Sequence, residues 1–195
     1  MKEAKLMKKT KLPIALGITT ILILLSILSG CTSSEEETNN PDTGDDFSFT
    51  ALDNAEKYLS DYRGKIVLVD MWATWCSPCQ YQMLELKKTY DYYGKDTVQI
   101  LSIDIDTRES IDMINQFKQE FANYDYDLEW TFGLVKDSLD AYMQEGAIPT
   151  LAIFDQQGNL AYRHAGLSYF DQIPSNYPAD QPQPPLLKEQ IDSLL

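Results

Sequence analysis

The chain has 195 residues, of which 44% are hydrophobic, and this length suits one domain with a real core better than two. Three cysteines are too few for a structural disulfide framework, so stability has to come from the core. The formal net charge of −14 argues against binding of nucleic acid or anionic lipid through the surface field, and we interpret it as an aid to solubility.

Residues 1–30 have the pattern of an export signal. Five lysines precede an apolar stretch at residues 12–28, and small residues follow it. The sequence Leu-Ser-Gly-Cys at residues 28–31 resembles the lipobox of lipoprotein signal peptides, which implies cleavage before Cys31 and lipidation of its sulfur. The alternative is an uncleaved membrane anchor, although a spanning helix needs about 20 apolar residues and this run is slightly short. Both alternatives tether the rest of the chain to the cell membrane, outside the cytoplasm.

Residues 31–46 are predicted to be the lipidated cysteine and a flexible acidic linker. No apolar side chain occurs in residues 32–46, so this segment cannot bury enough surface to offset the entropy of ordering it. Such a linker would hold the following domain away from the lipid. Without residues 1–30 the chain loses five lysines and one glutamate, so its formal charge falls from −14 to −18.

Residues 47–195 show the strand and helix pattern of one α/β domain. The predicted strands are residues 47–51, 66–69, 98–103, 128–132, 151–154 and 160–165, and the predicted helices are residues 78–93, 109–122, 135–143 and 186–195. The strand at 66–69 is apolar on both faces, which favours a central position with helices on both sides. A turn at 155–159 predicts a hairpin, and five prolines in 173–185 predict an irregular loop.

The strongest chemical signal is a pair of cysteines, Cys76 and Cys79, placed where a buried strand turns into a helix. Cys76 would lie at the helix N-terminus, where free backbone N–H groups and the helix dipole stabilise a thiolate. Pro78 suits the first helical turn. The two intervening residues allow Cys79 to close a small disulfide ring with Cys76. This arrangement suits attack on a disulfide, formation of a mixed disulfide and resolution by the second thiol.

Other interpretations of a Cys-x-x-Cys pair are half of a zinc site, a haem attachment site or a structural disulfide. Zinc needs about four ligands, and after residue 30 the chain offers only His164 and Cys31 in addition to the pair. Haem attachment needs a histidine at the position of Gln80. The strand–turn–helix context favours redox chemistry, and we expect no metal and no cofactor besides the cysteine pair itself.

Residues 72–79, with the sequence Trp-Ala-Thr-Trp-Cys-Ser-Pro-Cys, resemble the active-site segment of the thioredoxin superfamily, closest to its membrane-anchored TlpA/ResA-like branch. The resemblance extends from about Phe47 to the C-terminus. It implies a thioredoxin-like fold, with a central mixed β-sheet flanked by helices. It also implies that the residues between Ile103 and Gly146 contain an extra strand–helix insertion before a cis-proline loop.

The same resemblance implies which residues bind the substrate. The sequence Gly-Ala-Ile-Pro-Thr at 146–150 matches the family's cis-proline loop, in which Ile148 and Pro149 would present backbone to a substrate chain. An ordinary trans turn is the alternative. Trp75, Ser77 and Pro78 are expected to complete the substrate-binding surface around the cysteines.

Asp70 is the third predicted catalytic residue. It ends an apolar strand, and a buried carboxylate is costly unless it has a partner or a function. Its position matches the family's buried acid, which accepts the proton of the second cysteine, and burial would raise its pKa. The alternative is a partly solvated aspartate at the strand end. Thioredoxin itself has a lysine on the neighbouring strand, and we expect Ile100 at that place.

These features predict a membrane-tethered thiol–disulfide oxidoreductase that acts on extracytoplasmic cysteine-containing proteins as a monomer. The resemblance implies reduction, often for cytochrome c maturation, with electrons from a membrane thiol carrier. Ser77 departs from the acidic residue that several members carry, so the cytochrome role is only one candidate. A non-catalytic lipoprotein that holds cysteine-bearing chains is the alternative. A peroxiredoxin-like peroxidase is less favoured, because its peroxidatic cysteine lies in a different sequence context.

Overall fold

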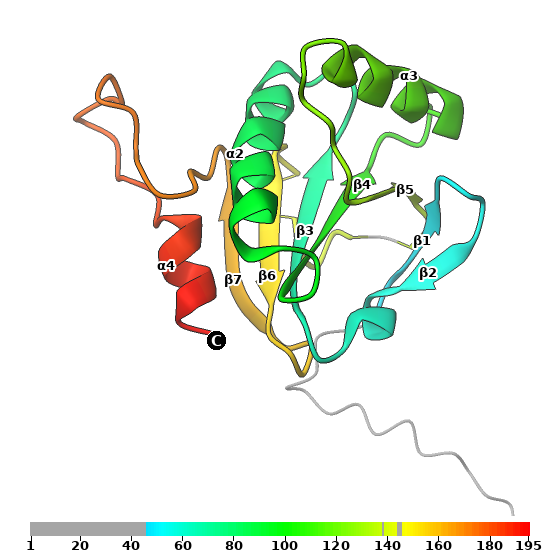
Figure 1. Cartoon of the computed structure of the whole chain (residues 1–195), viewed down its shortest axis with the longest axis horizontal. Helices are drawn as coiled ribbons and strands as arrows, with labels where there is room; N and C mark the ends of the chain where they lie inside the picture. The colour runs from blue at the N-terminus through cyan, green and yellow to red at the C-terminus, as the bar shows by residue number, and fades with distance from the viewer. Residues whose placement is uncertain (1–45, 138, 144–145) are drawn as a thin grey trace, which may run out of the picture. The chain divides into compact units, whose positions relative to one another are not determined.

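A computed structural model describes residues 46–137, 139–143 and 146–195 (Figure 1). The strands are β1 (Ser48–Ala51), β2 (Glu56–Tyr58), β3 (Ile66–Trp72), β4 (Val98–Asp104), β5 (Thr131–Val135), β6 (Thr150–Phe154) and β7 (Leu160–Ala165). The helices are the 3-10 helix η2 (Leu59–Tyr62) and the α-helices α2 (Ser77–Tyr93), α3 (Ile111–Ala122) and α4 (Leu187–Asp192). The predicted signal peptide, Cys31 and the linker up to residue 45 lie outside the described residues.

The sheet is mixed, with strand order β2-β1-β5-β4-β3-β6-β7. The central strands β3, β4 and β5 are parallel, and the helices α2 and α3 form the crossovers that parallel neighbours require. The strands β6 and β7 add an antiparallel hairpin beside β3, and β1 pairs antiparallel with β5. This arrangement confirms the predicted mixed sheet with flanking helices and the predicted hairpin.

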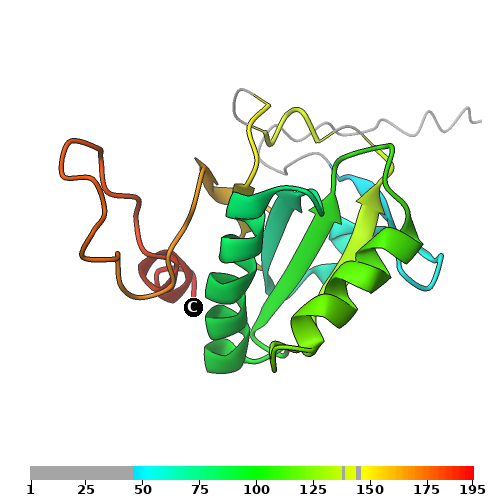
Figure 2. The same cartoon turned by 90° about the horizontal axis from the view of Figure 1, so that it is seen from above.

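The two faces of the sheet are covered differently. The helices α2, α3 and α4 all pack on one face, where Met83, Phe117 and Ile191 join one core cluster (Figure 2). A second cluster on the opposite face contains Leu59 of η2 and Tyr142. The prediction of helices on both sides of β3 is therefore confirmed only in part. In the described residues, the second face is covered by the short helix η2 and by non-helical segments.

The predicted helix at 135–143 is wrong. Val135 belongs to β5, where it pairs with Phe49 of β1. The described residues 139–143 form a single turn, in which the Tyr142 N–H donates to the Leu139 carbonyl at 2.8 Å. Leu139 and Tyr142 are buried against the sheet, so the apolar spacing that suggested a helix comes from a turn that covers the core. Strand β2 and helix η2 were not predicted, and β5 begins three residues later than expected.

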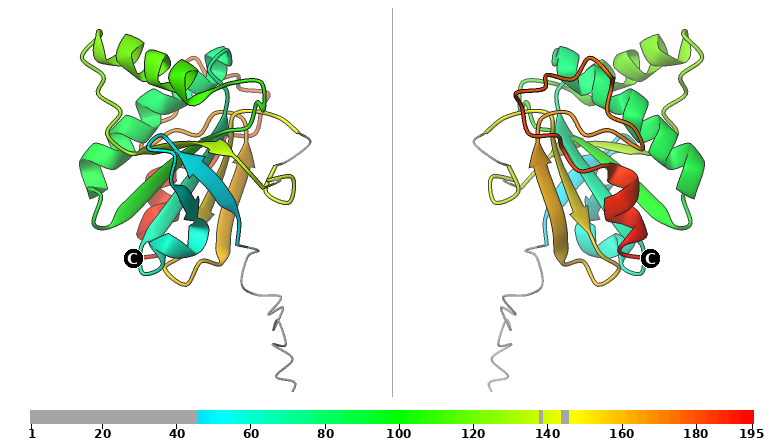
Figure 3. Two further views of the ribbon diagram at one scale, coloured as in Figure 1. Left: turned by 90° about the vertical axis from the view of Figure 1, so that its right-hand side faces the viewer. Right: turned by 90° about the vertical axis from the view of Figure 1, so that its left-hand side faces the viewer.

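A long connection between β7 and α4 runs beside α2 (Figure 3). Buried Gln82 of α2 fixes its start, since the side-chain amide donates to the Ser168 carbonyl at 3.1 Å and accepts from the Ser168 N–H at 2.8 Å. The hydroxyl of Tyr93 donates to Asp192 of α4 at 2.6 Å. Residues 173–185 contain turns but no helix or strand, as the prolines predict.

Two observations concern the N-terminal side of the domain. Asp46, the last residue of the predicted linker, accepts hydrogen bonds from the backbone N–H and the hydroxyl of Ser60, at 2.9 and 2.6 Å. Among the helices of the described ranges, none has the length and hydrophobicity needed to cross a membrane.

We expect Gly133→Ala to destabilise the fold. Gly133 lies in β5 between β1 and β4, and a Cβ there would stand 2.5 Å from a ring carbon of Phe49 and 2.7 Å from the carbonyl oxygen of Thr50. The backbone contact cannot be relieved by a rotamer change, so the free energy of unfolding should fall by about 1–3 kcal/mol in urea titrations. Alanine normally favours a strand over glycine, so an increase in stability would contradict the close approach.

Candidate active site

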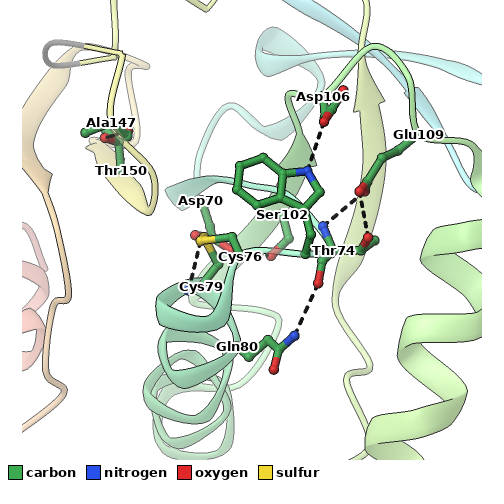
Figure 4. The surroundings of a disulfide bond; sticks show 11 residues. Asp70, Thr74, Cys76, Cys79, Gln80, Ser102, Asp106, Glu109, Ala147 and Thr150 are labelled. Carbon is green, nitrogen blue, oxygen red and sulfur yellow. Dashed lines mark hydrogen bonds between the residues drawn. A yellow bond between two sulfur atoms is a disulfide. The ribbon is translucent and has the colours of Figure 1, made fainter.

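The predicted cysteine pair forms a disulfide at the start of α2 (Figure 4). Cys76 is the N-cap residue of α2, and its Sγ accepts a hydrogen bond from the Cys79 N–H at 3.2 Å. Ser77 and Pro78 are the first two helical residues, and both are exposed. Cys76 is 4% exposed and Cys79 is fully buried, so Cys76 is the sulfur that a partner can reach first.

The position of Cys76 favours its thiolate form once the disulfide is reduced. The first backbone N–H groups of a helix lack helical partners, and the helix dipole adds positive potential at this end. The Cys79 N–H already points at the Cys76 sulfur. A charge-assisted hydrogen bond of this kind stabilises a thiolate and makes it a better nucleophile near neutral pH.

Asp70 lies fully buried in β3, and Figure 4 shows its side chain pointing toward the disulfide. The Ser102 hydroxyl donates to Oδ2 at 3.0 Å, while Oδ1 has no donor among the described residues. Burial raises the pKa of Asp70 to about 7, and the Ser102 hydrogen bond opposes this rise. The carboxyl group can therefore gain or lose a proton near neutral pH. Its complete burial contradicts the alternative of a partly solvated aspartate.

Ser102, not Ile100, is the neighbour of Asp70 on β4. The parallel register pairs Asp70 with Ser102 and pairs Ile100 with Leu68, so Ile100 lies two residues before the position directly opposite Asp70. The Ser102 hydroxyl also accepts a hydrogen bond from the indole N–H of Trp130 at 2.9 Å. The role of Ser102 could not be predicted, because the register of two parallel strands cannot be read from their composition. A serine in an otherwise apolar strand was the available signal.

The peptide bond between Ile148 and Pro149 is cis, as predicted. The Thr150 hydroxyl donates to the Ala147 carbonyl at 2.7 Å, and the Gly166 N–H donates to the Pro149 carbonyl at 2.8 Å. A cavity of about 300 Å³ lies beside this loop, and Trp75, Arg108 and Ile148 are among its lining residues. The structure thus brings two of the predicted substrate-binding residues, Trp75 and Ile148, to one hollow, and Trp75 directly precedes Cys76 in the chain.

Two acidic residues that follow β4 hold the loop in front of Cys76, and sequence analysis missed both. Glu109 accepts hydrogen bonds from the Thr74 N–H at 3.0 Å and from the Thr74 hydroxyl at 2.6 Å. Asp106 accepts a hydrogen bond from the indole N–H of Trp75 at 2.9 Å. Hydrogen bonds from Arg108 hold the pKa of Asp106 well below its ordinary value, so this group stays charged.

The described residues contain no group of three or more histidine, cysteine, aspartate or glutamate side chains placed to hold a metal ion. The groups that the structure brings together at the site are the two sulfurs and the buried carboxyl group of Asp70. A nucleophilic sulfur at a helix N-terminus, a buried second sulfur and a buried acid near its working pKa suit thiol–disulfide exchange.

The sequence of the chain is similar to those of several known proteins. A family model described as the AhpC/TSA family matches residues 42–163. The thiol-disulfide oxidoreductase ResA of Geobacillus kaustophilus is 33% identical over 121 residues, which cover 60% of this chain and 64% of that protein, slightly less than two thirds. The thioredoxin-like protein YneN of Bacillus subtilis is 31% identical over 122 residues, covering 62% of this chain and 68% of that protein. A ResA of Bacillus cereus is 27% identical over 171 residues, covering 86% and 95%.

Solved structures give the same picture of the fold. The thioredoxin domain of a thiol-disulfide oxidoreductase from Bacteroides vulgatus aligns with a TM-score of 0.53 and 25% identity, covering 64% of this chain and 86% of that chain. A DsbF homologue from Corynebacterium diphtheriae aligns with a TM-score of 0.52 and 20% identity, covering 62% and 75%, and is similar in fold alone. Since the family model covers more than half of the chain, this protein belongs to the AhpC/TSA family and has a thioredoxin-like fold.

Proposed function

We propose that this protein is a thiol–disulfide oxidoreductase that exchanges the Cys76–Cys79 pair with cysteines of other proteins. The observation that carries the proposal is the disulfide at the N-terminus of α2, with Cys76 on its accessible side and the buried acid Asp70 in the adjacent strand. The names of the relatives from Geobacillus and Bacillus support the same class of reaction.

In the reducing direction, the Cys76 thiolate attacks one sulfur of a substrate disulfide. The substrate S–S bond breaks, its other sulfur leaves as a thiolate, and a mixed disulfide with Cys76 forms. Cys79 then gives its proton to Asp70 and attacks the Cys76 sulfur, which releases the second substrate sulfur as a thiolate. Two electrons pass from the protein dithiol to the substrate, and the protein ends as the disulfide seen here.

We propose that the enzyme works outside the cytoplasm as a reductant, tethered to the membrane through lipidated Cys31. The lipobox-like residues 28–31 and the polar segment that follows support this location. Its substrates would be extracytoplasmic proteins with cysteine pairs, and a membrane thiol carrier would return the electrons. Cytochrome c maturation is one candidate pathway. An extended substrate chain would lie along Ile148 and Pro149, next to the hollow that Trp75 borders.

Two other functions make different predictions for variants of the two cysteines. A holding protein would bind cysteine-bearing chains without covalent exchange, and it would keep its function without Cys76. A peroxidase would consume peroxide at one cysteine. The hydrogen bond from the Cys79 N–H to Cys76 Sγ and the disulfide between the two residues favour dithiol exchange over both.

We expect Cys79→Ala to trap substrates as mixed disulfides on Cys76, because the resolving thiol is gone. The full-length variant would be recovered from acid-quenched cells, and its adducts would be identified by mass spectrometry before and after reduction. Cys76→Ser/Cys79→Ala is the matched control and should carry none. If the single variant also carries no covalent adduct, exchange with protein substrates is wrong.

We expect Asp70→Asn to slow resolution by about 100-fold or more at pH 7, because the asparagine cannot accept the Cys79 proton. The lifetime of the mixed disulfide with a cystine peptide would be measured by rapid acid quench. The difference should shrink above pH 9, where a thiol of ordinary pKa near 8.5 ionises unaided. Ser102→Ala removes a hydrogen bond that lowers the Asp70 pKa, so its pH profile should shift upward. Unchanged profiles in both variants would exclude Asp70 as the proton acceptor.

The stability of Asp70→Asn provides a control against misfolding of this variant. The raised pKa means that folded Asp70 keeps its proton to about pH 7, whereas the unfolded carboxyl loses its proton near pH 4. The folded state therefore binds more protons in this interval, and wild-type stability falls as pH rises from about 4 to about 7. Asp70→Asn should remove this loss, with a gain on the order of 2 kcal/mol at pH 8 relative to pH 5. If Asp70→Asn resolves the mixed disulfide more slowly and is also more stable than wild type at pH 8, unfolding cannot explain the slower reaction.

We expect the mature wild-type protein to begin at Cys31 with a thioether-linked diacylglycerol. The N-terminal peptide would be isolated from the membrane fraction and identified by intact mass. In Cys31→Ser the lipid should be absent and residues 1–30 should be retained, because the modified cysteine directs cleavage. A wild-type N-terminal peptide beginning at Met1 would favour the uncleaved anchor.

A further inference from the structure

Thr74, two residues before Cys76, has all of its polar groups engaged. Its N–H and its hydroxyl donate to the two carboxylate oxygens of Glu109, and its carbonyl accepts a hydrogen bond from the Gln80 side chain at 3.2 Å. The Cys76 N–H in turn donates to the Ala73 carbonyl at 3.1 Å. Hydrogen bonds therefore fix the backbone that leads into the nucleophile, and Glu109 supplies the carboxylate that holds Thr74.

Asp104 stands behind Glu109 at the end of β4, where it pairs in register with Trp72. It is fully buried, and Glu109 is 9% exposed. Oδ1 of Asp104 accepts a hydrogen bond from the Asp106 N–H at 2.9 Å. Its Oδ2 is buried and meets no donor within the described ranges. A buried oxygen without a hydrogen-bond partner is costly. If Asp104 and Glu109 share one proton, Oδ2 of Asp104 gains a hydrogen bond and the two carboxyl groups do not repel each other.

The charged groups around the pair agree with one shared proton. Burial and the neighbouring Glu109 raise the pKa of Asp104 to about 8. The hydrogen bonds from Asp104 and Thr74 outweigh burial and leave the pKa of Glu109 lowered. Asp106 is the other negative neighbour of both groups, and the positive Arg108 acts on Glu109 and Asp106. A proton held on Asp104 Oδ2 would satisfy this buried oxygen and allow it to donate to the Glu109 carboxylate.

We propose that Glu109 is a positioning residue for Cys76, and that Asp104 donates the shared proton that keeps the Glu109 carboxylate directed at Thr74. Glu109 touches neither sulfur and takes no part in the exchange itself. It fixes the turn that presents the Cys76 sulfur to the N–H groups of α2, and a small misplacement of a reacting group costs much of its rate. This proposal rests on the proposed function, because it assigns a role in the same reaction.

The test uses the reduced full-length protein and a small aromatic disulfide, 5,5′-dithiobis(2-nitrobenzoate), as the probe. The second-order rate constant of Cys76 is measured against pH, and its inflection gives the thiol pKa. We expect Glu109→Ala to lower the rate constant at pH 7 about tenfold and to raise the thiol pKa, because the loop no longer holds the sulfur against the helix N-terminus. Glu129→Gln is the control, because it also removes one negative charge but at an exposed position. This variant should match wild type.

Conservative variants separate positioning from charge and from packing. Glu109→Gln keeps an acceptor for the Thr74 N–H and a polar partner for its hydroxyl, so it should regain most of the wild-type rate constant. Asp104→Asn carries a permanent amide donor toward Glu109 and should also stay near wild type. A fall in Asp104→Asn as large as that in Glu109→Ala would overturn the shared proton. A purely structural role would lower the melting temperature without moving the thiol pKa.

The outcomes remain decisive if Glu109→Ala does not fold. Thr74→Val then removes only the hydroxyl contact to Glu109, and we expect a smaller fall of about threefold with the same upward shift of the thiol pKa. If Glu109→Ala, or Thr74→Val in its place, matches Glu129→Gln in both rate constant and thiol pKa, the positioning role is wrong. The probe is not a protein, so this failure is distinct from the failure to trap protein substrates with Cys79→Ala.

Discussion

The parallel pairing of β3 with β4 is the constraint on which the site depends. It places Asp70 opposite Ser102 and Trp72 opposite Asp104, so two buried carboxyl groups arise on neighbouring strands at the same edge of the sheet. The chain leaves β3 directly into the cysteine turn and leaves β4 directly into the segment that binds this turn. A shift of β4 by one residue relative to β3 would turn Ser102 and Asp104 to the opposite face of the sheet, away from Asp70. The surroundings of the two cysteines therefore depend on the register of two strands to which neither cysteine belongs.

The two buried acids keep protons for different physical reasons. Asp70 is raised in pKa chiefly by burial, and a single hydroxyl contacts its carboxyl group, so it can exchange a proton with a neighbouring thiol. Asp104 has burial and a second carboxyl group beside it, so its proton is needed to hold that neighbour in place. Gain of a proton by Asp70 is a step of the proposed reaction, whereas loss of the proton from Asp104 would place two carboxylate anions side by side behind the loop.

The sequence was sufficient for features that depend on neighbouring residues, and insufficient for those that depend on distant ones. Cys76, Pro78 and the strand before them define a local turn, so the disulfide at the helix start could be predicted. The cis bond before Pro149 followed from a resemblance. Ser102 was missed because it meets Asp70 only through strand register, and Glu109 because it reaches Thr74 across 35 residues of sequence. Val135 to Met143 has helical spacing, but the sheet face it covers was not visible in the sequence.

The insertion that precedes the cis-proline loop acquires a structural role from these contacts. Its first residues, Asp106 and Glu109, bind the Trp75 side chain and the Thr74 backbone, and α3 begins directly after them with Ser110 as its N-cap. Phe117 of the same helix packs on Trp72 at 4.7 Å between ring centroids, so α3 is fixed to the end of β3 as well. Movement of α3 would thus be transmitted to the residues that lead into Cys76.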